Sequence, residues 1–232
     1  MAGLSARDYG VPERTRRTKI GVLISGRGSN LQALIEAAAQ PDYPAEIALV
    51  IANVPEAAGL ERAEAVGIPT QVIDHRLFPS RVGFEAALTD ALHAADCELV
   101  CLAGFMRVLT GDFVARWQDR VINIHPSLLP AFPGLHTHAE ALATGVRITG
   151  ATVHFVREQV DQGPIIGQAA VPVLDDDDAD SLGARVLEAE HTLYPHCLRL
   201  VADGRARVQG NRVRVTGAEA PGTALLNPPV DG

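Results

Sequence analysis

Two hydrophobic periodicities alternate along this chain, one typical of buried strands and the other typical of helices. Short apolar runs rich in β-branched residues predict strands at residues 20–24, 47–51, 71–73 and 99–103. Between these runs apolar positions recur at helical spacing, and helices are expected from residue 30, near 56–66 and near 81–94. Strands that alternate with helices predict a Rossmann-like α/β fold, in which a mainly parallel twisted sheet carries helices on both faces.

The second half of the chain has a different pattern. Extended runs at 121–125, 150–156 and 165–173 predict further strands, and the last of these is expected to be antiparallel. A long amphipathic helix is expected over 180–201. Residues 205–216 predict a small hairpin with Gly-Asn at its turn. The C-terminal part should therefore add antiparallel strands to the sheet and end in a hairpin.

These elements predict one main domain. A hydrophobic content of 47% over 232 residues is enough for a sizeable core, and we assign the domain to residues 19–204 with the hairpin 205–216 packed on it. Residues 1–18 are polar and Arg-rich, which predicts a flexible N-terminal extension. Residues 217–232 are rich in Pro and Gly and predict a loose tail.

Composition narrows the class of protein. The formal charge of −8 at pH 7 argues against a general binder of nucleic acid or anionic membrane, because such binding depends on Lys and Arg. An anionic substrate therefore needs a local pocket. No apolar run approaches the roughly 20 residues that span a bilayer. Cys97, Cys101 and Cys197 form no CxxC motif and predict reduced, buried thiols in a cytoplasmic protein.

The turn after the first strand, residues 25–30 (Ser-Gly-Arg-Gly-Ser-Asn), is a candidate anion site. Backbone N–H groups and the dipole of the following helix attract a phosphate there, and Ser29 adds a hydroxyl. The alternative is a tight turn that needs glycine for steric reasons alone. A dinucleotide fingerprint matches poorly, because the third glycine position counted from Gly26 is Leu31.

Residues 123–130 (Asn-Ile-His-Pro-Ser-Leu-Leu-Pro) place reactive polar groups at the end of a hydrophobic strand. Asn123 and His125 are two residues apart, so their side chains should lie on the same side of the strand. An amide and an imidazole suit oxyanion stabilisation and proton transfer in acyl-group chemistry. A strand-end Asn and a capping His are the alternative. Asp161 falls in a Gly-Pro turn, where an ordinary turn aspartate is also compatible with the pattern.

Ligands of open α/β sheets bind outside the carboxyl ends of the strands. Three polar segments follow predicted strands and should share that rim, namely residues 25–30, 104–109 and 123–125. The acidic run 175–178 is more typical of a solvated loop before a helix than of a metal site. His136 and His138 have no Cys or carboxylate cluster beside them, so no metal is expected.

Several separated motifs together resemble one family. They are residues 24–32 (Ile-Ser-Gly-Arg-Gly-Ser-Asn-Leu-Gln), 102–109 (Leu-Ala-Gly-Phe-Met-Arg-Val-Leu), 123–130, 134–138 (Gly-Leu-His-Thr-His), 150–156 and 161–164 (Asp-Gln-Gly-Pro). In order and spacing they are similar to the folate-dependent phosphoribosylglycinamide formyltransferases of purine biosynthesis. The resemblance runs from about residue 19 to about residue 204.

That resemblance implies transfer of a formyl group from the co-substrate 10-formyltetrahydrofolate to the amine of N1-(5-phosphoribosyl)glycinamide, without a metal. It implies the catalytic residues Asn123, His125 and Asp161. The ribonucleotide-binding residues that it implies are Gly28, Ser29, Asn30 and Glu190. The implied folate-binding residues are Arg81, Met106, Arg107, Val108, Leu109 and Asn123. The expected partners are these small molecules, with no nucleic acid and no membrane, and the protein is expected to act as a monomer or homodimer.

The chemistry of the residues agrees with this assignment. An amine that attacks a formyl carbon creates an oxyanion, which Asn123 and a protonated His125 can stabilise, and losing one such donor typically costs about 100- to 1000-fold in rate. A carboxylate near His125 favours the imidazolium, and Asp161 is the candidate. The loops 126–138 and 157–163 are the expected moving parts.

Other readings remain open at this point. Another folate-dependent formyltransferase, or a formyltetrahydrofolate hydrolase, would share the Asn, His and Asp set. The hydrolase branch carries an N-terminal regulatory domain, which 18 residues are too few to form, and the methionyl-tRNA branch carries an extra C-terminal RNA-binding domain. A sugar-nucleotide formyltransferase is disfavoured by the phosphate turn. A non-catalytic nucleotide-binding module is a more remote alternative, because it leaves Asn123, His125 and Asp161 unexplained.

Overall fold

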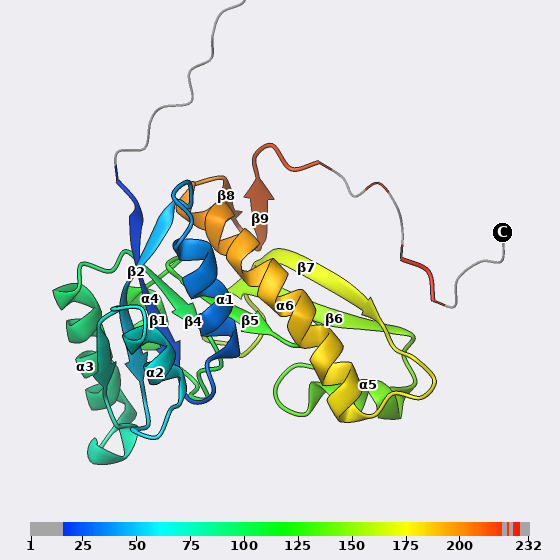
Figure 1. Cartoon of the computed structure of the whole chain (residues 1–232), viewed down its shortest axis with the longest axis horizontal. Helices are drawn as coiled ribbons and strands as arrows, with labels where there is room; N and C mark the ends of the chain where they lie inside the picture. Colours follow the sequence, from blue (N-terminus) through cyan, green and yellow to red (C-terminus); the bar gives the residue numbers. More distant parts are fainter. Residues whose placement is uncertain (1–15, 220–221, 223–224, 228–232) are drawn as a thin grey trace, which may run out of the picture.

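Seven strands form one sheet in the order β3-β2-β1-β4-β5-β6-β7. The computed structural model describes residues 16–219, 222 and 225–227 (Figure 1). The strands of the sheet are β1 (Thr18–Ile24), β2 (Ala45–Ala52), β3 (Thr70–Val72), β4 (Leu99–Leu102), β5 (Val121–His125), β6 (Ile148–Phe155) and β7 (Ile165–Pro172). The helices are α1 (Ser29–Ala38), α2 (Gly59–Glu64), η1 (His75–Leu77), α3 (Arg81–Ala94), α4 (Gly111–Arg116), α5 (Thr137–Thr144) and α6 (Ala179–Ala202).

The direction of the strands confirms the expected α/β fold with an antiparallel C-terminal part. Strands β1 to β5 pair in parallel, whereas β6 runs antiparallel to β5 and β7 antiparallel to β6. A separate hairpin of β8 (Ala206–Gln209) and β9 (Arg212–Val215) follows α6, as predicted. Its apolar residues Val208, Val213 and Val215 pack against the main core.

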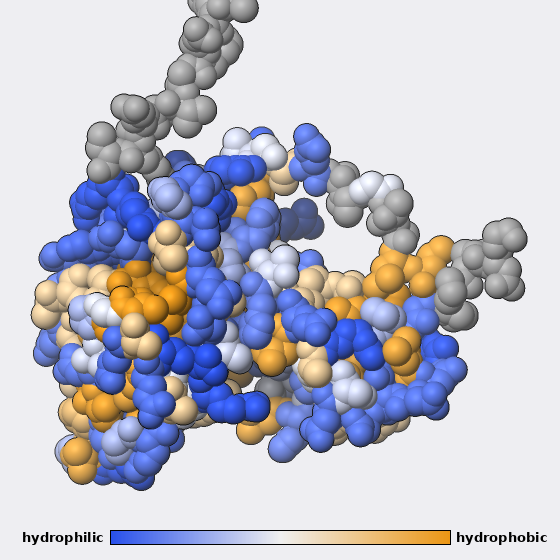
Figure 2. Space-filling view, viewed as in Figure 1, coloured by the Kyte–Doolittle hydropathy of each residue, from blue (hydrophilic) through white to orange (hydrophobic). Residues whose placement is uncertain are grey.

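The core has two parts, one on each face of the sheet, because successive strand residues point to opposite sides. Ile20, Val22 and Ile24 of β1 face the cluster that α1 and α6 cover, and Leu23 faces the cluster that α3 and α4 cover. Figure 1 shows α1 and α6 side by side on their face of the sheet. Figure 2 shows mainly hydrophilic side chains along the outer side of α6, as its alternating burial requires.

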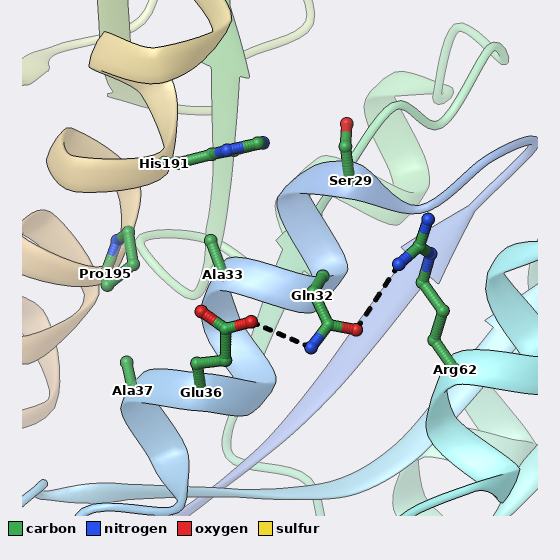
Figure 3. Close-up of a pocket in the computed structure, with 8 residues that line it drawn as sticks. All are labelled: Ser29, Gln32, Ala33, Glu36, Ala37, Arg62, His191 and Pro195. Atoms are coloured by element: carbon green, nitrogen blue, oxygen red, sulfur yellow. Dashed lines mark hydrogen bonds between the residues drawn. The ribbon is translucent and has the colours of Figure 1, made fainter.

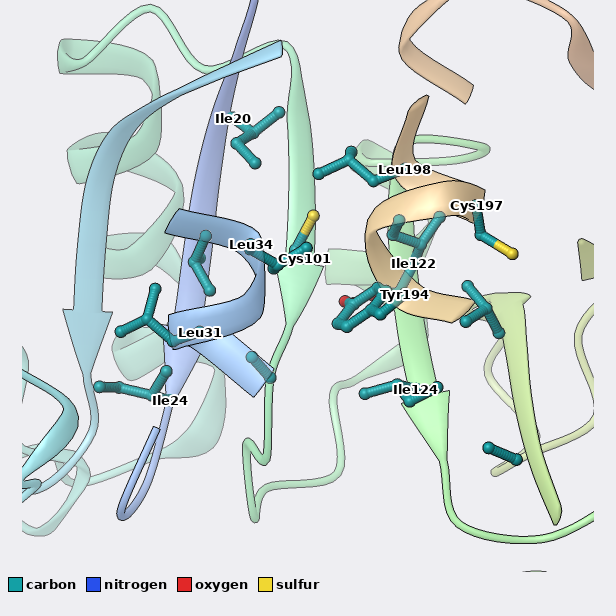
Figure 4. Packing of buried hydrophobic residues seen from close by; sticks show 14 of the residues in the cluster. Ile20, Ile24, Leu31, Leu34, Cys101, Ile122, Ile124, Tyr194, Cys197 and Leu198 are labelled. Atoms are coloured by element: carbon teal, nitrogen blue, oxygen red, sulfur yellow. The ribbon is translucent and has the colours of Figure 1, made fainter. Parts of the chain in front are cut away.

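Tyr194 of α6 ties the helix to the middle of the sheet. Its ring is fully buried and lies beside Cys101 of β4 and Ile122 and Ile124 of β5 (Figure 4). The hydroxyl lies 3.0 Å from the carbonyl oxygen of Leu102 and 3.1 Å from that of Ile122, so one proton is shared between the strands β4 and β5. This contact fixes α6 over the two strands that carry the candidate site.

The three cysteines are free and buried, as expected.

The structure differs from the sequence prediction at three helices. Two helices, α4 and α5, were not predicted, because both are short and present few apolar residues to the core. The expected helix near 56–66 is only the six residues Gly59–Glu64. It starts late because the N–H of Gly59 donates to the carbonyl of Gly26 at 3.0 Å, which holds residues 54–58 in a turn.

The acidic run 175–178 caps α6. Asp178 accepts from the N–H groups of Asp180 and Ser181 and forms a capping box with Ser181. Asp177 pairs with Arg185 at 2.7 Å. The Arg185 guanidinium holds the pKa of Asp177 far below its usual range.

The two predicted terminal segments lie largely outside the described residues. In the N-terminal extension, residues 1–15 are outside, and β1 begins at Thr18. In the tail, the amide of Asn227 donates to the carbonyls of Arg147 at 2.6 Å and Val173 at 2.9 Å. Within the described residues, no helix is long and apolar enough to cross a membrane.

Candidate active site

The pairing of β5 with β6 assembles the centre of the site. Asn123 lies opposite His154, and His125 lies opposite Thr152. Residues directly opposite in an antiparallel pair point to the same face, so these four side chains form one polar patch. The Asn123 amide nitrogen lies 3.3 Å from Nε2 of His154. The expectation that Asn123 and His125 share one side of the strand is confirmed.

His125 is 5% exposed and lies between two hydrogen-bond acceptors. Its Nε2 is 2.9 Å from the carbonyl oxygen of Phe132, and its Nδ1 is 3.4 Å from Oδ2 of Asp161. A carbonyl offers no proton, so Nε2 must supply the proton of the contact with Phe132. The Asp161 carboxylate faces the other ring nitrogen, Nδ1.

Asp161 reaches His125 from the loop between β6 and β7. Oδ2 accepts the Gly134 N–H at 2.8 Å, and Oδ1 lies 3.7 Å from Nε2 of His154. Burial by itself raises the pKa of Asp161, but the polar contacts with His154 and Gly134 and the charge of His125 outweigh burial and lower it. Asp161 is thus an ionised carboxylate held between two imidazoles.

The Asp161 loop is closely packed against the end of β6. Asp161 has a φ of 57°, which is uncommon for a residue with a side chain. Gly163 backs onto the strand so closely that a Cβ there would lie 1.6 Å from the Phe155 carbonyl oxygen. No side chain fits at position 163, and the glycine lets the loop approach His125.

His154 was not identified as a site residue from the sequence. Its Nδ1 lies 3.0 Å from the Phe155 carbonyl oxygen, so Nδ1 carries a proton, while Nε2 faces Asn123 and Asp161. The available signal was the strand pattern, in which polar Thr152 and His154 alternate with apolar Val153 and Phe155. Two polar residues on one face of an otherwise buried strand indicate a polar partner on the neighbouring strand.

A cavity of about 510 Å³ opens beside these groups. It is lined by Asn123, His125, His154 and Asp161 together with the loops that follow β4 and β5. Of the expected folate residues, the cavity includes Met106, Arg107, Val108, Leu109 and Asn123. Met106 and Val108 expose 65% and 52% of their surface, although both are apolar. Arg81, at the start of α3, does not line this cavity.

His136 and His138 lie at the edge of the same cavity. His136 is the N-cap residue just before α5 and has a φ of 62°. Burial lowers the pKa of His138, and the charge of His125 lowers it further. No group of three or more His, Cys, Asp or Glu side chains in the described part of the chain is arranged to hold a metal ion.

The glycine turn before α1 has the geometry of an anion site. Gly28 precedes α1 with a φ of 72°, and no side chain caps the helix, so the first N–H groups of α1 are available to a ligand. Neighbouring groups hold the turn in place. Gly59 N–H donates to the Gly26 carbonyl at 3.0 Å, and Arg62 Nε donates to the Arg27 carbonyl at 2.9 Å.

Asn30 and Glu190 meet at the inner side of this turn. The Asn30 amide donates to the Glu190 carboxyl at 2.7 Å, while Oδ1 of Asn30 is buried and has no hydrogen-bond partner among the described residues. Burial raises the pKa of Glu190 to about 7, against the opposing effect of the Asn30 hydrogen bond. Two residues 160 positions apart are thus in direct contact.

A second cavity of about 480 Å³ lies between α1, α2 and α6. It is lined by Ser29, Gln32, Ala33, Glu36, Ala37, Arg62, His191 and Pro195 (Figure 3). Figure 3 shows the His191 ring extending from α6 toward the start of α1. Within the part of the chain that the structure describes, the buried Nε2 of His191 has no hydrogen-bond partner. Arg62 and His191 therefore bring groups that can carry positive charge to the cavity beside Ser29.

Ser25 joins the glycine turn to the loop that follows β4. Its N–H donates to the Gly104 carbonyl at 3.1 Å, and its hydroxyl accepts the Met106 N–H at 2.7 Å. The same hydroxyl donates to the Asn53 side chain at 2.5 Å. Hydrogen bonds are therefore donated from the end of β1 to the loop after β4 and from that loop back to Ser25, as expected for neighbouring strands on one rim.

Comparison with known proteins identifies relatives of this chain. Residues 18–198 match the formyl transferase family. The chain is 43% identical over 202 residues to the phosphoribosylglycinamide formyltransferase of Escherichia coli, covering 87% of this chain and 95% of that protein. It is also 51% identical over 195 residues to the trifunctional purine biosynthetic protein adenosine-3 of Gallus gallus, covering 84% of this chain. The match spans only 19% of the length of that relative.

Solved structures are also similar to this chain, both in fold and in sequence. Glycinamide ribonucleotide transformylase 1 from Symbiobacterium toebii superposes with a TM-score of 0.84 at 48% identity, covering 86% of this chain and 94% of that one. A formyltetrahydrofolate deformylase from Pseudomonas syringae superposes with a TM-score of 0.80 at 26% identity, covering 87% of this chain and 66% of that one.

Proposed function

We propose that this chain transfers the formyl group of 10-formyltetrahydrofolate to the amine of N1-(5-phosphoribosyl)glycinamide. The premise is its family, because the chain belongs to the formyl transferase family and within it to the phosphoribosylglycinamide formyltransferases. The amine nitrogen bonds to the formyl carbon, and the bond from that carbon to folate N10 breaks. One proton leaves the amine and one is added to N10. The observation that carries this proposal is the placement of His125 beside Asn123 in the 510 Å³ cavity, with the Asp161 carboxylate facing its Nδ1.

The two ring nitrogens of His125 have different tasks. Nε2 is anchored at 2.9 Å to the Phe132 carbonyl, whereas Nδ1 is 3.4 Å from Asp161, longer than the roughly 2.7–2.9 Å of a charge-assisted hydrogen bond. The Nδ1–H is therefore the donor that an oxyanion engages. Asn123 supplies the second donor from its amide, and both stabilise the negative charge that develops on the formyl oxygen.

Asp161 supports the cation and the proton transfer. Its ionised carboxylate favours the imidazolium of His125 in the 5% exposed site. After attack, the amine carries positive charge, and its proton reaches N10 through water or through Asp161. Much of the acceleration comes from holding amine and formyl carbon in attack geometry, which requires a fixed place for each substrate.

The folate fits the 510 Å³ cavity. The loop 104–109 lines it and exposes the apolar Met106 and Val108, which suits the flat face of a pterin. Backbone groups of Arg107 and Leu109 are the proposed polar contacts. Arg81 is outside the cavity lining. Its proposed contact is therefore with the part of the folate that projects beyond the cavity.

The ribonucleotide phosphate fits the start of α1. The free N–H groups after Gly28 and the Ser29 hydroxyl are the proposed contacts, with Arg62 and His191 contributing positive charge from the cavity beside Ser29. Asn30 and Glu190 form a hydrogen-bonded pair, which suits the hydroxyl-rich ribose or the glycinamide end. We further propose that the protein acts on these small molecules in the cytoplasm, as a monomer or homodimer.

The test is an absorbance assay with 10-formyl-5,8-dideazafolate, with and without the ribonucleotide. We expect folate release only when the ribonucleotide is present, with one formyl group appearing on the amine per folate released. The His125→Ala variant serves as the control for chemistry at the proposed site, and its release should fall about 100-fold or more.

The alternative outcomes identify other functions. Release without the ribonucleotide would indicate a hydrolase, the activity named for the Pseudomonas syringae relative. No release under either condition, with the folate still bound, would indicate a binding protein. Release that requires a different amine acceptor would indicate another formyltransferase and would contradict the proposed acceptor.

A further inference from the structure

A row of three side chains crosses the sheet beneath the loop that follows β5. The strand pairing places His125 opposite Thr152 and Thr152 opposite Gln168, on β5, β6 and β7. His125 belongs to the proposed catalytic set. Thr152 is fully buried and does not line the cavity, so it has no route to a substrate.

The Thr152 hydroxyl is fully used in hydrogen bonds to this loop and to β7. It donates to the Ser127 carbonyl at 2.7 Å and accepts the Leu129 N–H at 3.0 Å. It also accepts from Gln168 Nε2 at 3.0 Å. A hydroxyl has one proton and two lone pairs, so all three are occupied. The same Gln168 nitrogen donates to the Leu129 carbonyl at 2.9 Å.

The loop that Thr152 holds returns to His125. The Ser127 N–H donates to the carbonyl of His125 at 2.9 Å. The Ser127 hydroxyl lies 2.6 Å from the Ala131 carbonyl and 3.0 Å from the Phe132 carbonyl. The Phe132 carbonyl is the acceptor for Nε2 of His125. A continuous set of hydrogen bonds therefore runs from Thr152 through the loop to the His125 ring.

We propose that Thr152, supported by Gln168, is a positioning residue that fixes residues 127–132 so that the Phe132 carbonyl orients the His125 ring with Nδ1 toward the cavity. This inference rests on the proposed function of His125. Without a fixed Phe132 carbonyl, the ring is free to rotate about its bond to the backbone, and Nδ1 then points at the wrong place. A misplacement of about 1 Å in a catalytic group is enough to cost roughly 100-fold in rate.

The test compares Thr152→Val with Thr152→Ser. Valine has the shape of threonine without the hydroxyl, so the Leu129 N–H and the Ser127 carbonyl lose their partner. We expect kcat to fall about 10- to 100-fold, while KM for the ribonucleotide changes less than about 2-fold because the phosphate turn is separate. Thr152→Ser keeps the hydroxyl and should retain kcat within about 3-fold of wild type.

A spectroscopic readout separates positioning from general damage. In 15N-labelled wild-type protein, the Nε2–H proton of His125 should give a slowly exchanging resonance, because it is buried against the Phe132 carbonyl. This resonance should be lost in Thr152→Val and kept in Thr152→Ser. Thr149→Val is the matched control, since Thr149 is another buried threonine of β6 that pairs with Val171 away from the loop.

A milder variant keeps the inference testable if Thr152→Val does not fold. Gln168 is an exposed residue of the edge strand β7, and Gln168→Leu removes its two donated bonds without emptying the core. We expect a fall in kcat of about 3- to 10-fold and faster exchange of the same Nε2–H proton.

Two results would overturn the inference. One is a Thr152→Val or Gln168→Leu protein with unchanged kcat, and the other is a fall in kcat with the Nε2–H resonance preserved. If wild-type protein shows no formyl transfer, the proposed function fails, whereas the resonance comparison still decides whether Thr152 orients His125.

Discussion

The main catalytic proposal depends on which atoms surround one imidazole. His125 has a backbone carbonyl at one ring nitrogen and a carboxylate at the other, so its charge and its orientation are set by different neighbours. In the proposed mechanism Asp161 favours the charged ring and supports proton transfer, while Phe132 orients the ring. Removing either neighbour should therefore affect the reaction differently.

Asp161→Asn is predicted to lower kcat about 100-fold while the protein stays folded. The amide keeps an oxygen for the Gly134 N–H but no longer stabilises the His125 imidazolium. Kinetic assays at neutral pH, with the thermal midpoint as the control for folding, check this. A variant with wild-type turnover would remove Asp161 from the mechanism.

The sign of the Asp161 pKa shift also fixes a pH window. Its pKa is lowered, since polar contacts and neighbouring charge outweigh burial. The stabilisation from ionised Asp161 is present above the ordinary carboxyl pKa of about 3.9 and is lost only as pH falls through the lowered value. Activity should therefore show no loss from Asp161 protonation between pH 5 and pH 7, roughly the range above that ordinary value.

At the scale of single residues, the sequence predicted which side chains form the candidate site but not which groups surround them. Asn123, His125 and Asp161 were predicted, and the structure brings them together. The Phe132 carbonyl and the Gly134 N–H were beyond prediction, because they are backbone groups whose positions depend on a loop conformation. His154 was missed because its role depends on the β5–β6 register, which pairs it with Asn123.

At the scale of elements, the start of α1 concentrates the features of a phosphate site. The helix begins after a glycine with no side-chain cap, so its dipole and free N–H groups favour negative charge. Short helices leave little pattern in a sequence. α4 and α5 were missed because six to eight residues with few buried apolar positions give little periodicity.

Ser29→Asp is predicted to weaken ribonucleotide binding by about 10-fold or more. The added carboxylate occupies the anion position at the helix start and repels the phosphate, and like charges at close range in a partly buried site cost more than 1 kcal/mol. Titration calorimetry with the ribonucleotide checks this. Gln40→Glu adds the same charge at an exposed position just after the far end of α1 and should leave the affinity within about 2-fold of wild type.

Ser25→Ala is predicted to weaken folate binding without affecting the ribonucleotide. The change removes the acceptor for the Met106 N–H at 2.7 Å and loosens the loop that lines the cavity. One hydrogen bond of about 1 kcal/mol corresponds to roughly a 5-fold rise in Kd. Calorimetry with the dideazafolate measures this. An equal loss for both ligands would show that Ser25 supports the whole rim rather than the folate loop.

At the scale of the whole molecule, the sequence predicted the architecture because long runs of strand and helix periodicity alternate over five parallel strands. The antiparallel β6 and β7 were also expected, and they are the strands that carry His154, Thr152 and Gln168. Periodicity does not predict which polar groups are buried by helices that are distant in the sequence. Asn30 and Glu190 meet only because α1 and α6 pack together on one face of the sheet.

That burial makes the stability of the free protein depend on pH. The Glu190 pKa is raised by burial from 4.5 to about 7, so the folded protein holds this proton more tightly than the unfolded chain. The Glu190 contribution is fully present below the unfolded value and is lost as pH rises through the folded value. A shift of this size corresponds to a loss of about 3 kcal/mol in the free energy of unfolding.

Glu190→Gln is predicted to remove this dependence, because glutamine keeps an oxygen for Asn30 and has no proton to lose. The difference in unfolding free energy between variant and wild type should grow by up to about 3 kcal/mol from pH 4.5 to pH 8, as measured by urea unfolding without ligands. Glu188→Gln, at an exposed position of the same helix, should give a constant difference. A constant difference for Glu190→Gln as well would mean that Glu190 is hydrated in the free protein and that α1 and α6 leave the turn open to water.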